Sequence, residues 1–197
     1  MATAGPSLPG TGASGGTGQA WVNPSNITAD DATEATCTRY TPGDTAELQA
    51  TNFGFAIPTG ATIDGIEAVW ERRADYNSTG NNTKDKVVKL LIGGVLSGDN
   101  KADTATRWPT STASKTYGSS SDKWGLTPLY SDVNASNFGV IVQGTIVGSN
   151  VSRVDKATIT ITYTLAGYSH SVTGVAGASI STVISVATAA ISTVSGV

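Results

Sequence analysis

A hydrolase built on a Ser-His-Asp or Cys-His arrangement needs a histidine beside its nucleophile. The chain has one histidine, His170, and one cysteine, Cys37. His170 lies in a stretch of small residues, and nothing in that stretch predicts a pocket. We therefore expect no catalysis of this kind. A single cysteine excludes an internal disulfide and a metal site made of several cysteines. We expect Cys37 to be a small buried hydrophobic residue.

Carboxylates could serve a glycosidase or bind calcium, and six of them are candidates. They are Asp30, Asp31, Glu67, Glu71, Asp75 and Asp103. Their spacing selects no catalytic pair, and neither Asp30-Asp31 nor the Asn81-Asn82/Asp85 stretch has the spacing of an EF-hand. Turn formation is the simpler interpretation. We therefore predict no catalytic residue, no metal site and no cofactor.

Aromatic residues in loop-like sequence could stack on sugar rings. Four such residues are Trp108, Tyr117, Trp124 and Tyr130. They are the candidate glycan-binding residues of this chain. The alternative is that they pack long loops against the folded domain.

The strongest pattern lies near the C-terminal end, where apolar residues recur with a period of eleven. The apolar columns contain Val172, Val175, Ile180, Val183, Val186, Ile191, Val194 and Val197. A fixed period indicates a repeated unit that cannot bury its apolar column alone. We predict that residues 166–197 form an assembly tail, whose contacts join this chain to copies of itself, as a trimer, or to a neighbouring protein.

Two conformations fit the period of eleven. A helix would form a right-handed coil, but Val, Ile, Thr, Ser and Gly are mediocre or poor helix formers. The alternative is a short extended piece and a turn in each repeat. A disordered or expression-derived tail is the third interpretation, which the regularity of the repeat disfavours.

Composition narrows the class of partner. The chain of 197 residues is 39% hydrophobic and 14% charged, with a net charge of −3. Because the net charge is not positive, nucleic acid is not an expected partner. No apolar run reaches the length needed to cross a membrane, so we expect no membrane partner.

Alternation of apolar and polar residues predicts an all-β domain. The clearest strand is ATITITYTL, in which Ala157, Ile159, Ile161, Tyr163 and Leu165 face one side. Two further alternating sets are Ile66, Ala68 and Trp70, and Phe138, Val140, Val142 and Ile146. Strands with long polar loops predict a jelly-roll-like antiparallel β-sandwich over residues 19–165. Residues 1–18 are rich in Gly, Ser, Thr and Ala, and predict a flexible N-terminal arm that orders, if at all, on another subunit.

The middle of the chain resembles a domain that recurs in structural proteins of tailed bacteriophages. The resemblance is carried by ATNFGFAIPTGATIDGIEAVWERRA, VVKLLIGG, SDKWGL, DVNASNFGVIVQ and ATITITYT, in that order. The tail pattern I-x-x-V-x-G-V-A-x-A-S also resembles repeats that follow such domains in phage head and tail appendages, although Ser185 replaces the glycine of the second copy.

The resemblance implies a virion component that is not an enzyme and binds neighbouring subunits. Capsid decoration (cement) and a head or tail appendage both remain open. The alternative function is a carbohydrate-binding module that recognises a host surface glycan from a tail fibre.

Overall fold

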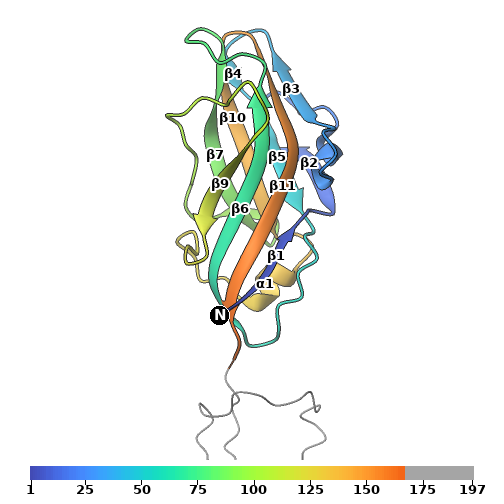
Figure 1. Ribbon diagram of the computed structural model, residues 1–197, viewed down its shortest axis with the longest axis vertical. Coiled ribbons are helices and arrows are strands. Elements are labelled where there is room, and N and C mark those ends of the chain that lie inside the picture. Colours follow the sequence, from blue (N-terminus) through green and yellow to red (C-terminus); the bar gives the residue numbers. More distant parts are fainter. Residues whose placement is uncertain (167–197) are drawn as a thin grey trace, which may run out of the picture.

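Two antiparallel sheets pack face to face in the computed structural model, which describes residues 1–166 (Figure 1). The first sheet contains β1 (Ala2–Ser7), β3 (Ala35–Arg39), β6 (Thr62–Ala74), β9 (Ala113–Ser119) and β11 (Asn150–Thr164). The second contains β2 (Thr11–Gly15), β4 (Gly43–Asp44), β5 (Glu47–Thr51), β7 (Asn82–Ile92), β8 (Val95–Ser97) and β10 (Gly139–Val147). The helical segments of the described chain are short, namely η1 (Pro24–Thr28) and α1 (Tyr130–Asn134).

The order of the strands confirms the predicted jelly roll. A jelly roll forms when an antiparallel hairpin of eight strands wraps around a core, so that the first strand pairs with the last, the second with the seventh, and so on inward. The pairs observed are β3 with β11, β5 with β10, β6 with β9, and β7 with β8. β11 also pairs with β6, and β10 with β7, which joins these eight strands into a four-stranded core in each of the two sheets.

The core follows the predicted alternation. In β6, Ile66, Ala68 and Trp70 are buried. In β11, Ala157, Ile159 and Ile161 are buried, whereas Tyr163 is half-buried and Leu165 is exposed. The strand therefore leaves the sandwich near Thr164, and the apolar column no longer faces the opposite sheet beyond that point.

Strand β10 departs from the expected one-sided burial. Val140 and Val142 face the core as predicted, but Ile141 and Gln143 are buried as well. The amide of Gln143 donates hydrogen bonds to the carbonyl oxygens of Thr17 (3.1 Å) and Thr45 (2.9 Å). Neighbouring segments thus cover the outer side of this central strand.

The prediction of a flexible N-terminal arm is wrong. β1 pairs with the C-terminal half of β11, beyond the stretch that pairs with β3. β2 pairs with β5 and forms the edge of the second sheet. Residues 1–18 are ordered despite their low apolar content because their backbone forms hydrogen bonds to β11 and β5. Their small side chains also allow the backbone to lie close to neighbouring segments. At Gly12, for example, a Cβ atom would lie 2.2 Å from the carbonyl oxygen of Pro24.

Two polar stretches contribute strands. Asn82 to Asp85 belongs to β7 and pairs with β10, so the loop after β6 covers only residues 75–81. Within the long polar stretch 97–121, Ala113–Ser119 forms β9 along β6. The segment around Asp132 forms the five-residue helix α1.

Candidate functional site

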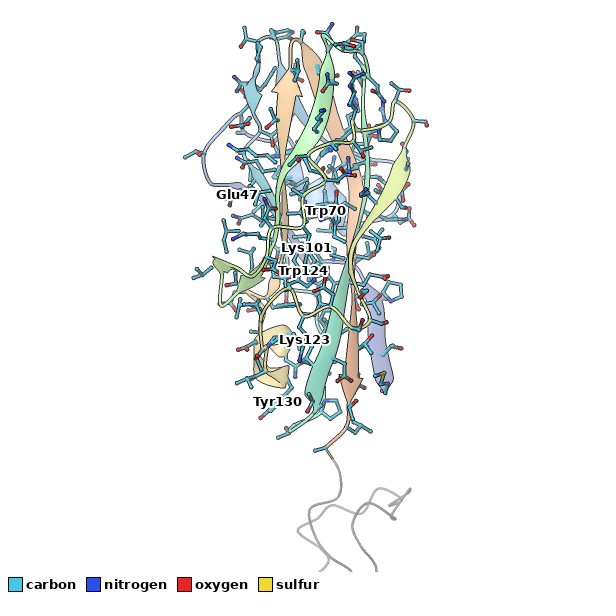
Figure 2. The ribbon with its side chains drawn as sticks, turned by 90° about the vertical axis from the view of Figure 1, so that its left-hand side faces the viewer. Glu47, Trp70, Lys101, Lys123, Trp124 and Tyr130 are labelled. Carbon is cyan, nitrogen blue, oxygen red and sulfur yellow. The ribbon has the colours of Figure 1, made fainter. Side chains whose placement is uncertain are left out.

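The aromatic residues predicted to bind glycan do not form an exposed platform. Trp108 and Trp124 are fully buried, Tyr117 is buried, and Tyr130 is half-buried at the start of α1. Figure 2 places Trp124 with Trp70 within the sandwich. The prediction that these rings stack on sugars is therefore wrong for the first three residues. The alternative interpretation, in which the rings pack loops against the domain, describes their positions.

Two of these aromatics use their polar atoms to bind a buried carboxylate. The indole Nε1 of Trp108 donates a hydrogen bond to Asp85 Oδ1 (2.7 Å), and the hydroxyl of Tyr117 donates to Asp85 Oδ2 (2.6 Å). The backbone N–H of Asp103 donates to the same Oδ2 (3.1 Å). Asp85 thus joins β7, β9 and the 100–112 segment in one cluster.

Arg72 supplies the positive charge of this cluster. Its Nη2 lies 3.4 Å from Asp85 and donates a 2.9 Å hydrogen bond to the hydroxyl of Tyr117. Its guanidinium carbon lies 4.6 Å from the ring centroid of Trp108, a distance typical of a cation–π contact. Burial, and next the charge of Asp85, raise the pKa of Tyr117. Because all four side chains are buried, the cluster fits a structural tie better than a substrate site.

Trp124 contacts the end of the β6–β9 pair, where Ile66 lies opposite Ser119. Its Nε1 donates a 2.9 Å hydrogen bond to the carbonyl oxygen of Ile66, and its backbone lies in the left-handed region (φ 58°). A Cβ atom at Gly118 would lie 2.6 Å from Trp124 Nε1. The indole therefore depends on a glycine in the facing strand.

Cys37 lies in β3 and is fully buried, as predicted. Burial raises the pKa of its thiol to about 11, against a smaller opposite effect of Arg39. A thiol in this state is a weak nucleophile at neutral pH.

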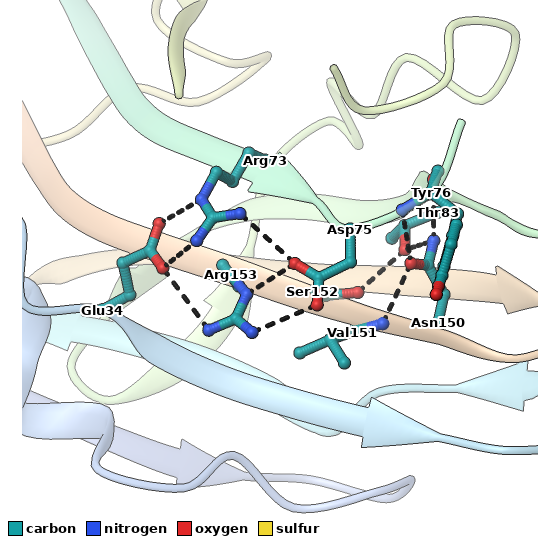
Figure 3. Close-up of polar contacts among 9 residues, drawn as sticks. All are labelled: Glu34, Arg73, Asp75, Tyr76, Thr83, Asn150, Val151, Ser152 and Arg153. Atoms are coloured by element: carbon teal, nitrogen blue, oxygen red, sulfur yellow. Dashed lines mark hydrogen bonds and ion pairs between the residues drawn. The ribbon is translucent and has the colours of Figure 1, made fainter. Parts of the chain in front are cut away.

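The outer face of the first sheet carries a closed ring of four charged residues (Figure 3). Arg73 binds both oxygens of Glu34 at 2.7 Å and reaches Asp75 Oδ1 at 3.2 Å. Arg153 binds the two oxygens of Asp75 at 2.7 and 3.1 Å and lies 3.6 Å from Glu34. Two cations and two anions satisfy one another, so this ring needs no ligand and ties the loop before β3 to β6 and β11.

A second charged cluster lies next to this ring. Asp30, Glu71 and Asp155 place carboxylate oxygens within 4.8 Å of one another, and Lys156 contacts the first two. Asp30 and Glu71 were among the candidate carboxylates, but the pattern of the sequence did not single out Asp155. Asp103 does not join them, since it binds Lys115 at 2.7 Å and accepts hydrogen bonds from the following turn.

Exposed apolar residues gather where β11 leaves the sandwich. Met1, Leu129 and Leu165 expose 92%, 59% and 56% of their surface. The pairing brings them to one end, because Ala2 pairs with Tyr163, and Thr62 pairs with Thr164 and bridges to Leu129. Figure 1 shows the N-terminus, α1 and the end of β11 together at this end, which we call the base. The predicted oligomerisation residues Val172, Val175, Ile180, Val183, Val186, Ile191, Val194 and Val197 lie outside the described residues.

The opposite end presents two exposed tyrosines. Tyr40 and Tyr76 expose 83% and 58% of their surface. Asn150 lies between them, since it pairs with Arg39 and exchanges hydrogen bonds with the backbone of Tyr76. Tyr40 follows β3 and Tyr76 follows β6, the two strands that flank β11, and strands on either side of a common neighbour lie about 10 Å apart. We call this end, which contains the turn between β10 and β11, the tip.

No family model, curated protein or solved structure matches this chain. Within residues 1–166, no helix has both the length and the apolar character that crossing a membrane requires. The class that the structure itself defines is an all-β jelly-roll sandwich.

Proposed function

We propose that the protein is a structural component of a bacteriophage virion that binds neighbouring subunits through its base and tail. The observation that carries this proposal is the exposed apolar group at the base, Met1, Leu129 and Leu165, at the point where β11 ends. Exposed apolar groups of this kind mark contact surfaces. The apolar columns of the tail follow directly in the sequence.

Energetics favour assembly over an independent tail. Burying one Val or Ile side chain contributes about 1.5–3 kcal/mol, whereas ordering one residue costs about 1–2 kcal/mol of backbone entropy. Most positions of the tail are small residues that bury little. One tail alone therefore gains too little, while several tails packed together, or one tail in a groove of a neighbour, gain enough.

The resemblance to tailed-phage structural proteins supplies the rest of the proposal. Capsid decoration and a head or tail appendage are equally compatible with a sandwich that attaches at one end. A mass-spectrometric inventory of separately purified heads and tails of the encoding phage tests the location. Absence of the chain from both fractions would overturn the proposal.

The assembly role is tested in the full-length chain. Replacing Val172, Val183 and Val194 together by Asp adds three charges to one apolar column. The matched control replaces Ser171, Thr182 and Thr193 by Asp, one position earlier in each repeat. We expect the first variant to sediment as a smaller species and to be excluded from particles, and the control to assemble. Equal assembly of both variants would show that the column is not the contact.

The tip supports a second candidate function, recognition of a host surface glycan. Tyr40 and Tyr76 are exposed at the tip, where a protein attached through its base would meet a host surface. Aromatic rings stack on apolar faces of sugars, and these two, unlike Trp108 or Trp124, are accessible. A glycan array compares the wild-type chain with the Tyr40→Ala/Tyr76→Ala variant. Binding that survives the double substitution would rule out the tip.

A further inference from the structure

A β-bulge in β11 places Asp155 against the outer face of the first sheet. Val154 pairs with Arg72 and Lys156 pairs with Glu71, so Asp155 has no partner residue on β6. Bulges of this type change the direction of a side chain and occur often next to functional sites. Here the bulge leaves the two consecutive residues Val154 and Asp155 both buried.

One carboxylate oxygen of Asp155 is buried without a hydrogen-bond partner. The residue is 4% exposed, and its Oδ1 has no partner among the described residues. A buried charged oxygen normally has a partner, because loss of its hydration is otherwise uncompensated. The unpartnered Asp155 oxygen therefore indicates that a ligand is missing from this position.

The ligand must be positively charged. Asp30, Glu71 and Asp155 bring three negative charges within 4.8 Å, and one ammonium, that of Lys156, contacts Asp30 and Glu71. The group thus has a net charge of −2, in contrast to the neutral ring of Glu34, Arg73, Asp75 and Arg153 beside it. Burial, followed by the charges of Glu71, Asp30 and Asp31, raises the pKa of Asp155.

We propose that Asp30, Glu71 and Asp155 bind a divalent cation of the calcium class. All three ligands are oxygen atoms, as hard cations require. Ca²⁺ accepts irregular sites with oxygens at about 2.3–2.6 Å, whereas Mg²⁺ demands a near-ideal octahedron and gives up its bound waters reluctantly. The three oxygens here lie within 4.8 Å of one another and come from a loop and two adjacent strands, an irregular set that suits the more adaptable ion.

Calcium would displace the ammonium of Lys156 rather than share the site with it. The Lys156 side chain is partly exposed and has a flexible stem, so its charge can turn to solvent. Asp30 belongs to the loop after η1, whereas Glu71 and Asp155 belong to adjacent strands. The bound ion would therefore fix this loop to the sheet, beside the place where Glu34 does so.

Isothermal titration calorimetry of the chelator-treated full-length protein with CaCl₂, and separately with MgCl₂, tests the site. We expect saturable binding of one Ca²⁺ and at least tenfold weaker binding of Mg²⁺. Asp155→Asn and Glu71→Gln should each abolish the calcium isotherm. Glu67→Gln, which removes a carboxylate from the same face of β6 four residues earlier, is the matched control and should bind like the wild type.

A gain-of-binding variant keeps the test decisive if a loss variant folds poorly. Lys156→Met removes the competing ammonium and should tighten calcium binding at least tenfold. The proposal is overturned if neither the wild type nor Lys156→Met binds CaCl₂, if Asp155→Asn binds it as tightly as the wild type, or if Mg²⁺ binds more tightly than Ca²⁺. None of these outcomes bears on the virion role, which the particle inventory tests separately.

Discussion

The indole of Trp108 donates a 2.7 Å hydrogen bond to the buried carboxylate of Asp85, so a loop aromatic and a strand acid form one internal pair. Tyr117 and Arg72 complete the surroundings of the carboxylate from β9 and β6. Breaking a buried charged cluster leaves an uncompensated charge, and this cost makes each partner important for stability.

Tyr117→Phe should destabilise the protein by about 1–3 kcal/mol, because it removes one donor to Asp85 and leaves the ring in place. Tyr40→Phe removes a hydroxyl from an exposed tyrosine and is the matched control, with an expected change below about 0.5 kcal/mol. Urea unfolding followed by tryptophan fluorescence measures both. Equal stability of the two variants would show that the Tyr117 hydroxyl contributes nothing to stability.

Gly5→Ala should detach β1 from β11. Gly5 has φ +106°, and a Cβ atom there would lie 2.5 Å from the carbonyl oxygen of Ile159. We expect amide hydrogen exchange of residues 2–4 to be slow in the wild type and fast in this variant. Thr3→Ala, at an exposed position of the same strand, should retain slow exchange. Fast exchange in the wild type would restore the flexible arm that the composition predicted.

The predictable part of the fold is the part in which side chains determine burial. β6 and β11 followed their alternation because one face of each strand packs against the other sheet. Residues 1–18 did not, because their order comes from backbone pairing with β11 and β5, which composition does not encode. The same applies to Ile141 in β10, whose burial depends on segments distant in the sequence.

The sites were less predictable than the fold. Trp108 and Tyr117 stand in loop-like sequence, and only the tertiary structure shows that they face Asp85 rather than solvent. Asp155 follows a buried valine in the strand, and no sequence pattern predicts the bulge that changes the direction of its side chain. A carboxylate next to Val154 inside a long strand was nevertheless a detectable irregularity in the alternation.

Acid should destabilise the protein through Asp75. The hydrogen bond from Arg153 chiefly lowers the pKa of Asp75, burial opposes this effect, and the charges of Arg153 and Arg73 add to it. A carboxyl whose pKa is lowered in the folded state stabilises the protein above its unfolded pKa of about 3.9, and this contribution disappears as the pH falls through the folded pKa.

Asp75→Asn should therefore cost about 1–3 kcal/mol at pH 7 and little at a pH below the folded pKa of Asp75. Urea unfolding of both proteins from pH 7 to pH 2 measures the difference. Glu67→Gln should show no such pH-dependent difference, because it removes a carboxylate outside the ring. A difference between wild type and Asp75→Asn that stays constant over this range would contradict the assignment.

Cys37 should report the opening of β3 from the sandwich. Its pKa of about 11 leaves a thiolate fraction near 10⁻³ at pH 8, against about one quarter for a free cysteine of pKa 8.5. Burial adds a steric barrier, so the native chain should react with an aromatic disulfide reagent at least about 100-fold more slowly than the urea-unfolded chain. The single thiol makes the assay unambiguous. Reaction at the unfolded rate would mean that β3 does not stay paired with β11, and the first strand of the jelly roll would have to be reassigned.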